Sequence, residues 1–186
     1  MSATLSKEEI LTLSQLITKL NLSILKLRDS ERVADYIQLT KTPPILTESM
    51  IFYLIKDKRI LNHLNHSRVR HNEKAKKHAG TSAGNTDIII DLSPMDREYL
   101  VEVKGTRNPS NFTQFYEKDI EADCVIWIDL TDTYLGGKSG VKIAIIENPK
   151  DSGLQSGKIS WGQSAFDDVR MKIIEFESIS DLLYED

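Results

Sequence analysis

Two acidic residues and one lysine stand on two neighbouring stretches that have the residue pattern of β-strands. The first stretch, residues 86–91, contains Asp87, and the second, residues 99–105, contains Glu102 and Lys104. Side chains of a strand alternate between its two faces, so Glu102 and Lys104 share one face while the valines beside them point to the other. The sequence therefore predicts a hairpin that gathers carboxylates and an ammonium group on one side.

The turn between the two stretches sets which side chains meet. A pairing of Leu92 with Tyr99 makes the strands antiparallel and places Asp87 across from Lys104. Asp91 shares the face of Asp87 and is the alternative acid for the same site. Asp87 is preferred because it opens the strand after a glycine-containing loop, where a ligand can approach, and because it faces Lys104.

These side chains suit a hard divalent cation. Mg²⁺ takes oxygen ligands, usually one or two carboxylates with water and substrate phosphate, and Asp87 and Glu102 supply such donors. Lys104 adds a positive charge beside them. The alternative is a hairpin edge held by salt bridges without a metal, because an acid-x-Lys triplet by itself is a common pattern. The metal site is favoured because the triplet lies on an apolar strand and is the single match in the chain.

The residues Asp87 and Glu102-Val103-Lys104 resemble the catalytic motif of the PD-(D/E)XK nucleases, the restriction-endonuclease-like superfamily. Thr86 stands where the motif of that family has proline. The resemblance implies an α/β fold with a restriction-endonuclease-like core, in which a central mixed β-sheet is flanked by helices. The core order of helix, acid-bearing hairpin, helix and strand is matched here by residues 46–65, 87–105, 112–122 and 124–130.

The resemblance also implies an activity, the metal-dependent hydrolysis of DNA phosphodiester bonds to a 5'-phosphate and a 3'-hydroxyl. Mg²⁺, for which Mn²⁺ is expected to substitute, would bind Asp87, Glu102 and the carbonyl of Val103. Lys104 would orient the attacking water and stabilise the charge that develops on the phosphate.

Two further positions take a role from the resemblance alone. Glu48 lies near the front of the helix before the hairpin and is expected to reach the metal site, although the helix macrodipole explains an acid in a first turn equally well. Gln114 is expected in the next helix, where some family members place a glutamine beside the metal. Asp91 and Gln114 are thus candidates for indirect support of the metal ligands.

Charge is distributed unevenly along the chain. Residues 56–78, here called the basic segment, contain eight Lys or Arg and two Asp or Glu, whereas the whole chain has a net charge of -4. This asymmetry is typical of a protein that meets a polyanion with one face, so double-stranded DNA is the predicted partner. The alternative is a solvated basic loop without a ligand. The residues expected to contact DNA are Arg68, Arg70, Lys74, Lys76 and Lys77.

A chain of 186 residues with ordinary apolar content is expected to form one domain, residues 1–186, with residues 1–42 as an N-terminal helical extension. Ser6 and Glu9 form a capping-box pattern before the first helix, and Thr47 is expected to cap another. A further helix is expected from residue 29. Strands are expected at residues 142–147 and 171–176, and a closing helix at residues 178–184.

The chain is expected to be cytoplasmic. Its first residues lack the basic-then-apolar pattern of a leader, and no apolar run is expected to reach membrane-spanning length, so no membrane partner is predicted. Cys124 is the single cysteine, which excludes an internal disulfide, and it lies in a predicted buried strand.

The sequence shows no helix-turn-helix or zinc-finger pattern that would read a DNA site. The resemblance is therefore narrowed to the small cleavage subunit of heterodimeric type IIS restriction endonucleases, in which a larger subunit recognises the DNA. A self-sufficient homodimeric type II enzyme is the alternative with the same chemistry. A non-catalytic DNA-binding or assembly module that uses the basic segment is the alternative from another class, and RNA as substrate is disfavoured because no aromatic stacking platform is evident.

Overall fold

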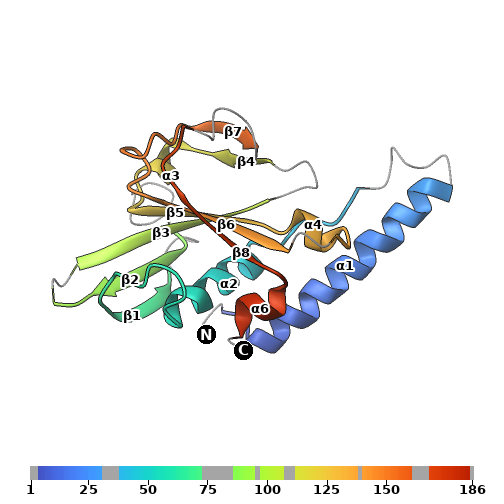
Figure 1. The fold of residues 1–186 in the computed structure, drawn as a ribbon, viewed down its shortest axis with the longest axis horizontal. Helices are drawn as coiled ribbons and strands as arrows, with labels where there is room; N and C mark the ends of the chain where they lie inside the picture. Colours follow the sequence, from blue (N-terminus) through green and yellow to red (C-terminus); the bar gives the residue numbers. More distant parts are fainter. Residues whose placement is uncertain are drawn as a thin grey trace.

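The structure, a computed structural model, describes residues 4–30, 38–72, 86–94, 97–106, 112–137, 140–160 and 168–184. Its centre is a six-stranded sheet with the strand order β1-β2-β3-β5-β6-β8, and a second sheet pairs β4 with β7 (Figure 1). The strands are β1 (His66–His71), β2 (Ile88–Leu92), β3 (Arg97–Gly105), β4 (Phe112–Phe115), β5 (Cys124–Asp129), β6 (Val141–Glu147), β7 (Gly157–Ser160) and β8 (Lys172–Phe176). The helices are α1 (Lys7–Ser30), α2 (Pro44–Lys56), α3 (Glu117–Ile120), α4 (Thr131–Tyr134) and α6 (Ile179–Leu183).

The large sheet is mixed. Strands β3 and β5 run parallel, whereas every other neighbouring pair in this sheet is antiparallel. Parallel neighbours need a crossover connection, and the described part of that connection contains β4 and α3. The predicted α/β class, with a central mixed sheet flanked by helices, is confirmed.

One face of the large sheet, here called the helical face, packs against α1, α2 and α6 (Figure 1). Ile88, Ile90 and Val101 alternate along β2 and β3 and are fully buried in this core. Full burial of such a side chain stabilises the fold by roughly 1.5–3 kcal/mol. The alternation therefore fixes which side chains are left for the opposite face, and these include Asp87, Glu102 and Lys104.

The opposite face is covered unequally. Over β5 and β6 it carries a second core, in which Phe115 of β4 and Ile159 of β7 pack on Val125 and Trp127 of β5. Figure 1 shows β4, β7 and α3 on this side of the sheet, away from the long helices. Arg70 of β1 lies on the same face and keeps a side-chain exposure of 31%, so the described layers close one half of the face and leave the other partly open.

Helix α1 begins as the sequence predicts. The Ser6 hydroxyl accepts a hydrogen bond from the Glu9 N–H at 3.2 Å, and the Glu9 carboxylate accepts one from the Ser6 N–H at 2.7 Å, which completes the capping box. Ile10 and Ile17 bury this helix in the main core. A further helix from residue 29 was predicted, but α1 continues to Ser30, and residues 31–37 lie outside the described residues.

One described helix contradicts the expectation about membrane-spanning length. By length and composition alone, residues Lys7–Asp29 of α1 meet the criteria for a membrane span. The core helix of a soluble protein and a signal sequence near an N-terminus meet the same criteria, so this finding is weak evidence for a membrane.

Two predicted helices are wrong in part. Residues 46–65 do not form one helix, because α2 ends at Lys56 and the chain then forms the edge strand β1. Residues 112–122 form β4 and the short α3 instead of one helix, because β4 pairs with the distant β7. Thr47 does not cap α2, since the cap position is Pro43 and the Thr47 hydroxyl bonds back to the Pro44 carbonyl at 2.9 Å.

The later elements agree with the prediction. Cys124 is fully buried in β5, and β6 and β8 lie where strands were expected. The closing helix is α6, and the hydroxyl of Ser178 caps it by accepting the Asp181 N–H at 3.0 Å.

Candidate active site

The hairpin of β2 and β3 has a tighter register than predicted. Leu92 pairs with Arg97 instead of Tyr99, and Ile88 pairs with Val101, so the same register places Asp87 across from Glu102 instead of Lys104. The predicted pairing was wrong by two residues. A shift of two keeps every side chain on its predicted face, whereas a shift of one would have sent the acids into the core.

Asp87 is held at the start of β2 by both neighbouring strands. Its N–H donates to the Val101 carbonyl at 3.1 Å, and its carbonyl accepts the Asn72 N–H at 2.9 Å. Its side-chain oxygen Oδ2 accepts the Val103 N–H at 2.8 Å. The N–H and C=O of a strand residue point to the same side, so the carbonyl of Val103 also faces Asp87.

Lys104 lies between two carboxylates. Its ammonium nitrogen Nζ is 2.6 Å from Glu102 Oε1 and 3.0 Å from Asp119 Oδ2, and it stands 5.8 Å from the centre of the Tyr116 ring. The side-chain exposures are 11% for Lys104, 6% for Glu102 and 0% for Asp119. These ionisable groups therefore interact largely shielded from water, where charges act more strongly on each other.

Burial changes the protonation of this group. It raises the pKa of Asp87, and the charge of Glu48 raises it further, although the Val103 N–H and Lys104 oppose the shift. Burial likewise raises the pKa of Glu102, and Asp87 adds to that shift. Two adjacent buried carboxylates resist ionising together, and a bound divalent cation would favour the doubly ionised pair.

The pKa of Lys104 also depends on burial and on the neighbouring carboxylates, but for a lysine these act in opposite directions. Burial by itself would lower its pKa, but the carboxylates of Glu102 and Asp119 outweigh burial, and the pKa of Lys104 is raised. The residue therefore remains a cation beside the acids, which is the state needed to stabilise charge on a phosphate.

Glu48 reaches the same end of the hairpin from the other side of the sheet. The start of α2 lies against the end of β3, where a Cβ atom added to Gly105 would stand 2.9 Å from Thr47 Cγ2. Glu48 follows in the first turns of α2, and its Oε2 is 4.0 Å from His71 Nδ1. Its influence on the pKa of Asp87 places Glu48 within electrostatic range of the site.

The donors fit a hard cation in type and number. Asp87, Glu102 and the Val103 carbonyl offer oxygen atoms, and Mg²⁺ in proteins uses one or two carboxylates with several waters. Among the described residues, no group of three or more His, Cys, Asp or Glu side chains is arranged to hold a metal. A cation here would thus depend on two carboxylates, and Glu102 would exchange its contact with Lys104 for one with the ion.

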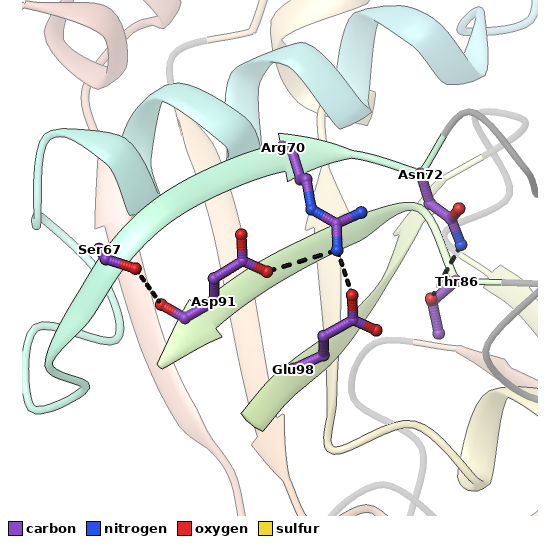
Figure 2. A network of polar contacts seen from close by, with 6 residues as sticks. All are labelled: Ser67, Arg70, Asn72, Thr86, Asp91 and Glu98. Atoms are coloured by element: carbon purple, nitrogen blue, oxygen red, sulfur yellow. Dashed lines mark hydrogen bonds and ion pairs between the residues drawn. The ribbon is translucent and has the colours of Figure 1, made fainter. Parts of the chain in front are cut away.

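Asp91, the alternative ligand, takes part in a different network. Its carboxylate oxygen Oδ1 is 3.4 Å from Arg70 Nη2, and Arg70 also pairs with Glu98 (Figure 2). Asp91 pairs with Glu98 across the strands, about 13 Å along β2 from Asp87 at a rise of roughly 3.3 Å per residue. The geometry brings Asp87, and not Asp91, to Glu102 and Lys104.

The network around Arg70 borders a cleft of about 570 Å³ on the same face of the sheet. The cleft is lined by Ser67, Arg68, Arg70, Asp91, Leu92, Arg97 and Glu98. Arg97 also forms an ion pair, because its Nη2 is 2.5 Å from Asp123 Oδ1. Arg68 is exposed and forms no ion pair within the described parts of the chain.

The other residues predicted to bind DNA or the site are placed as follows. Lys74, Lys76 and Lys77 lie outside the described residues. Gln114 lies on strand β4 instead of a helix, and its Nε2 donates to the Phe115 carbonyl at 3.1 Å. The Gln114 amide is thus bonded to the backbone of its own strand, and no contact between the described residues joins it to Asp87 or Glu102.

Sequence reasoning missed Asp119. Its only local signal is an acid at the third position of a short helix, where its Oδ2 accepts the Tyr116 N–H at 2.8 Å. Neighbouring acids at Glu117 and Glu121 give no reason to single it out from the sequence. The crossover between β3 and β5 is what brings Asp119 to Lys104.

Comparisons of the chain with protein-family models, with curated proteins and with solved structures found no match.

Proposed function

We propose that this protein is a magnesium-dependent endodeoxyribonuclease with a restriction-endonuclease-like core. The observation that carries the proposal is the meeting of Asp87 with Glu102 across β2 and β3, next to Lys104, in a largely buried group at the end of a partly open face. Perturbed ionisable groups of this kind are concentrated at functional sites, although structural ion pairs produce them too.

The order of elements supports the same proposal. The acid-bearing hairpin of β2 and β3 follows α2, and it is followed by α3 and by β5, which is parallel to β3. With β1 and β4 inserted and the second helix shortened to α3, this order corresponds to the helix, hairpin, helix and strand that the motif resemblance implies. The strand β1 extends the hairpin on one side, and β6 and β8 extend the sheet on the other.

The proposed chemistry is an in-line attack of water on a phosphodiester. Bound to Asp87, Glu102 and the Val103 carbonyl, Mg²⁺ would supply Lewis acidity and lower the pKa of a bound water. Lys104 donates hydrogen bonds to the phosphate oxygens, where negative charge increases in the transition state. The bond from phosphorus to the 3' oxygen breaks, the 3' oxygen takes up a proton, and the phosphate remains on the 5' side.

DNA would lie along the open part of the same face. The cleft around Arg70, here called the arginine cleft, lies on β1, β2 and β3, and the catalytic group lies on β2 and β3 of the same face, so a duplex that delivers a phosphate to Lys104 passes over Arg68 and Arg70. Contacts of this kind are to the backbone and confer little sequence preference.

The narrower proposal is a small catalytic subunit that cuts one strand together with a larger DNA-recognising subunit. The described elements are all used in one sheet and its two covering layers, and none of them forms a separate helix-turn-helix or zinc module. Specific cleavage by the isolated chain would instead favour a homodimeric enzyme. In either case we propose that it acts in the cytoplasm.

Purified protein, supplied with Mg²⁺ and duplex DNA, tests the activity. Glu102→Gln and Lys104→Met are expected to reduce cleavage by about 100-fold or more, because each removes a charge at the reacting phosphate. Glu175→Gln is the control, since Glu175 is an exposed acid paired with Lys142 at 3.5 Å on distant strands. Cleavage undiminished in both site variants would refute the proposal.

The second candidate is a non-catalytic DNA-binding or assembly module. The arginine cleft favours it, because the cleft is formed without the acids Asp87 and Glu102. This function predicts binding that weakens with salt, needs no Mg²⁺ and survives Asp87→Asn. Binding with these properties, together with no cleavage by the wild-type chain or with a larger subunit, would favour it.

A further inference from the structure

We propose that Asp119 is a positioning residue, which holds the ammonium group of Lys104 at the reacting phosphate. This inference rests on the proposed nuclease function and adds to it a residue that the motif does not contain. Within the described residues, Asp119 forms an ion pair with Lys104 alone, so we expect its main effect on cleavage to pass through Lys104.

The contact is built from a fully buried carboxylate. Asp119 Oδ2 is 3.0 Å from Lys104 Nζ, and the exposure of the Asp119 side chain is 0%. A buried charge is costly unless it is paired, so Asp119 and Lys104 require each other. The pair therefore joins α3 of the crossover to the end of β3.

The Asp119 carboxylate is itself fixed in position. Its Oδ2 also accepts the Tyr116 N–H at 2.8 Å, where the chain enters α3. Its Oδ1 is buried and has no hydrogen-bond partner among the described residues. Such an incompletely satisfied buried acid is unusual in a group with a purely structural role.

Glu102 cannot hold Lys104 in the same way during the reaction. Its Oε1 contacts Lys104 Nζ at 2.6 Å, yet the proposed function also assigns Glu102 to a cation. The two demands compete for one carboxylate. Asp119 has no second assignment, and it therefore remains as the anion that keeps Lys104 in place when Glu102 turns away.

The competing explanation is a purely structural role, in which the ion pair between Asp119 and Lys104 stabilises the packing of the crossover on the sheet. The two explanations differ in how the effects of substitutions combine. A residue that acts through Lys104 loses its effect when Lys104 is absent, whereas an independent structural effect persists and multiplies.

The experiment is a double-mutant cycle with Asp119→Asn, Lys104→Met and the double variant. At saturating DNA, Asp119→Asn is expected to lower kcat by about 10- to 100-fold with KM for DNA within about twofold, because the ammonium is misplaced while the binding surface is kept. In the Lys104→Met background, Asp119→Asn is expected to change kcat by less than about twofold. Multiplying effects, or an unchanged kcat in Asp119→Asn, would overturn the proposal.

The matched control is Asp123→Asn. Asp123 has the same pair of contacts as Asp119, since Oδ1 pairs with Arg97 at 2.5 Å and Oδ2 accepts the Leu100 N–H at 2.8 Å. It is expected to retain kcat, so a general loss from any broken ion pair would show in this variant. Should Asp119→Asn fail to fold, Asp119→Glu keeps the charge, and we expect a kcat between those of the wild type and Lys104→Met; a kcat equal to that of Lys104→Met would count against the role.

A second readout does not depend on cleavage. Mg²⁺ affinity, measured by calorimetry on the intact chain, is expected to fall in Asp119→Asn, because Lys104 is then left with Glu102 alone and competes harder with the ion. The loss is expected to be smaller in the Lys104→Met background, and equal losses in both backgrounds would overturn the inference. A wild-type chain that binds Mg²⁺ in this pattern and cleaves no DNA, either alone or with a larger DNA-recognising subunit, would refute the proposed function and leave the coupling of Asp119 to Lys104 established.

Discussion

Two groups of acids around a basic side chain lie on the same face of β2 and β3, and the two groups differ in how deeply they are buried. At one end Lys104 lies between Glu102 and Asp119 with side-chain exposures of 11%, 6% and 0%. Toward the other end of the strands, Arg70 lies between Asp91 and Glu98, whose exposures are 31% and 52%. Charges in the first group interact in a poorly solvated space, whereas water screens the second.

This difference shows that residue types do not define a site by themselves. Both groups contain two carboxylates and one basic side chain, which come from β3 and α3 in the first group and from β1, β2 and β3 in the second. Burial raises the pKa of Glu102 in the shielded group and that of the neighbouring Asp87, and a shielded group is also the one able to act strongly on a phosphate. The exposed group is suited to weak and exchangeable contacts with a nucleic-acid backbone.

The largest expected effect is on DNA cleavage, when the acid at one end of the β2 strand face, Asp87, is compared with the acid at the other end, Asp91. Asp87→Asn is expected to lower DNA cleavage by about 100-fold or more, because it removes a proposed metal ligand. Asp91→Asn, the same substitution on the same strand face, is expected to stay within about threefold of wild type. Steady-state cleavage of a duplex measures both, and a greater loss in Asp91→Asn than in Asp87→Asn would reverse the assignment of the two ends.

A middle-sized effect is expected on the pH dependence of stability in the absence of Mg²⁺. The folded-state pKa values of Asp87 and Glu102 are raised above their ordinary values of 3.8 and 4.5, so above those values the folded chain binds more protons than the unfolded chain. The stability that these bound protons provide is fully present below the ordinary values. It is lost as pH rises through the raised values, by about 1.4 kcal/mol per pH unit for each proton difference.

Urea unfolding between about pH 5 and pH 9 measures this slope. Asp87→Asn is expected to flatten it by removing one of the two acids. Addition of Mg²⁺ is expected to stabilise the wild type more at the alkaline end, where the ligands ionise more easily. A slope in Asp87→Asn equal to that of the wild type would show that the buried Asp87 carboxyl does not set the pH dependence.

The smallest effect is expected in the cleft. Glu98→Gln frees Arg70 from one of its two acids and is expected to tighten DNA binding by about threefold, because one competing anion is removed. Glu175→Gln makes the same change of charge at an exposed pair on β8 and controls for net charge. Fluorescence anisotropy without Mg²⁺ measures the affinity, and an equal gain in both variants would mean that overall charge, and not the cleft, is responsible.

The salt dependence of DNA binding gives a second test of whether the cleft contacts the DNA backbone. Arg68→Ala is expected to reduce the slope of log affinity against log salt by about one, as for the loss of a single phosphate contact. An unchanged slope would show that the open face of β1 does not meet the backbone.

Patterns that depend on near neighbours were predicted well. The capping box of Ser6 and Glu9, the buried strand around Cys124 and the closing helix within residues 178–184 each depend on groups within a few residues. Elements that depend on distant partners were not. Strand β4 was taken for a helix because its partner β7 lies more than forty residues away, and β1 was missed because its pairing with β2 crosses a long connection.

The sequence by itself determined the chemical character of the group, because alternation sends Asp87, Glu102 and Lys104 to one face in either register that keeps parity. Tertiary structure decided the contacts. It placed Asp87 across from Glu102, paired Arg70 with Asp91, and brought Asp119 beside Lys104. The reason is physical. Alternation is a local property of an extended backbone, whereas strand register, burial and the path of the crossover depend on packing between segments far apart in the chain.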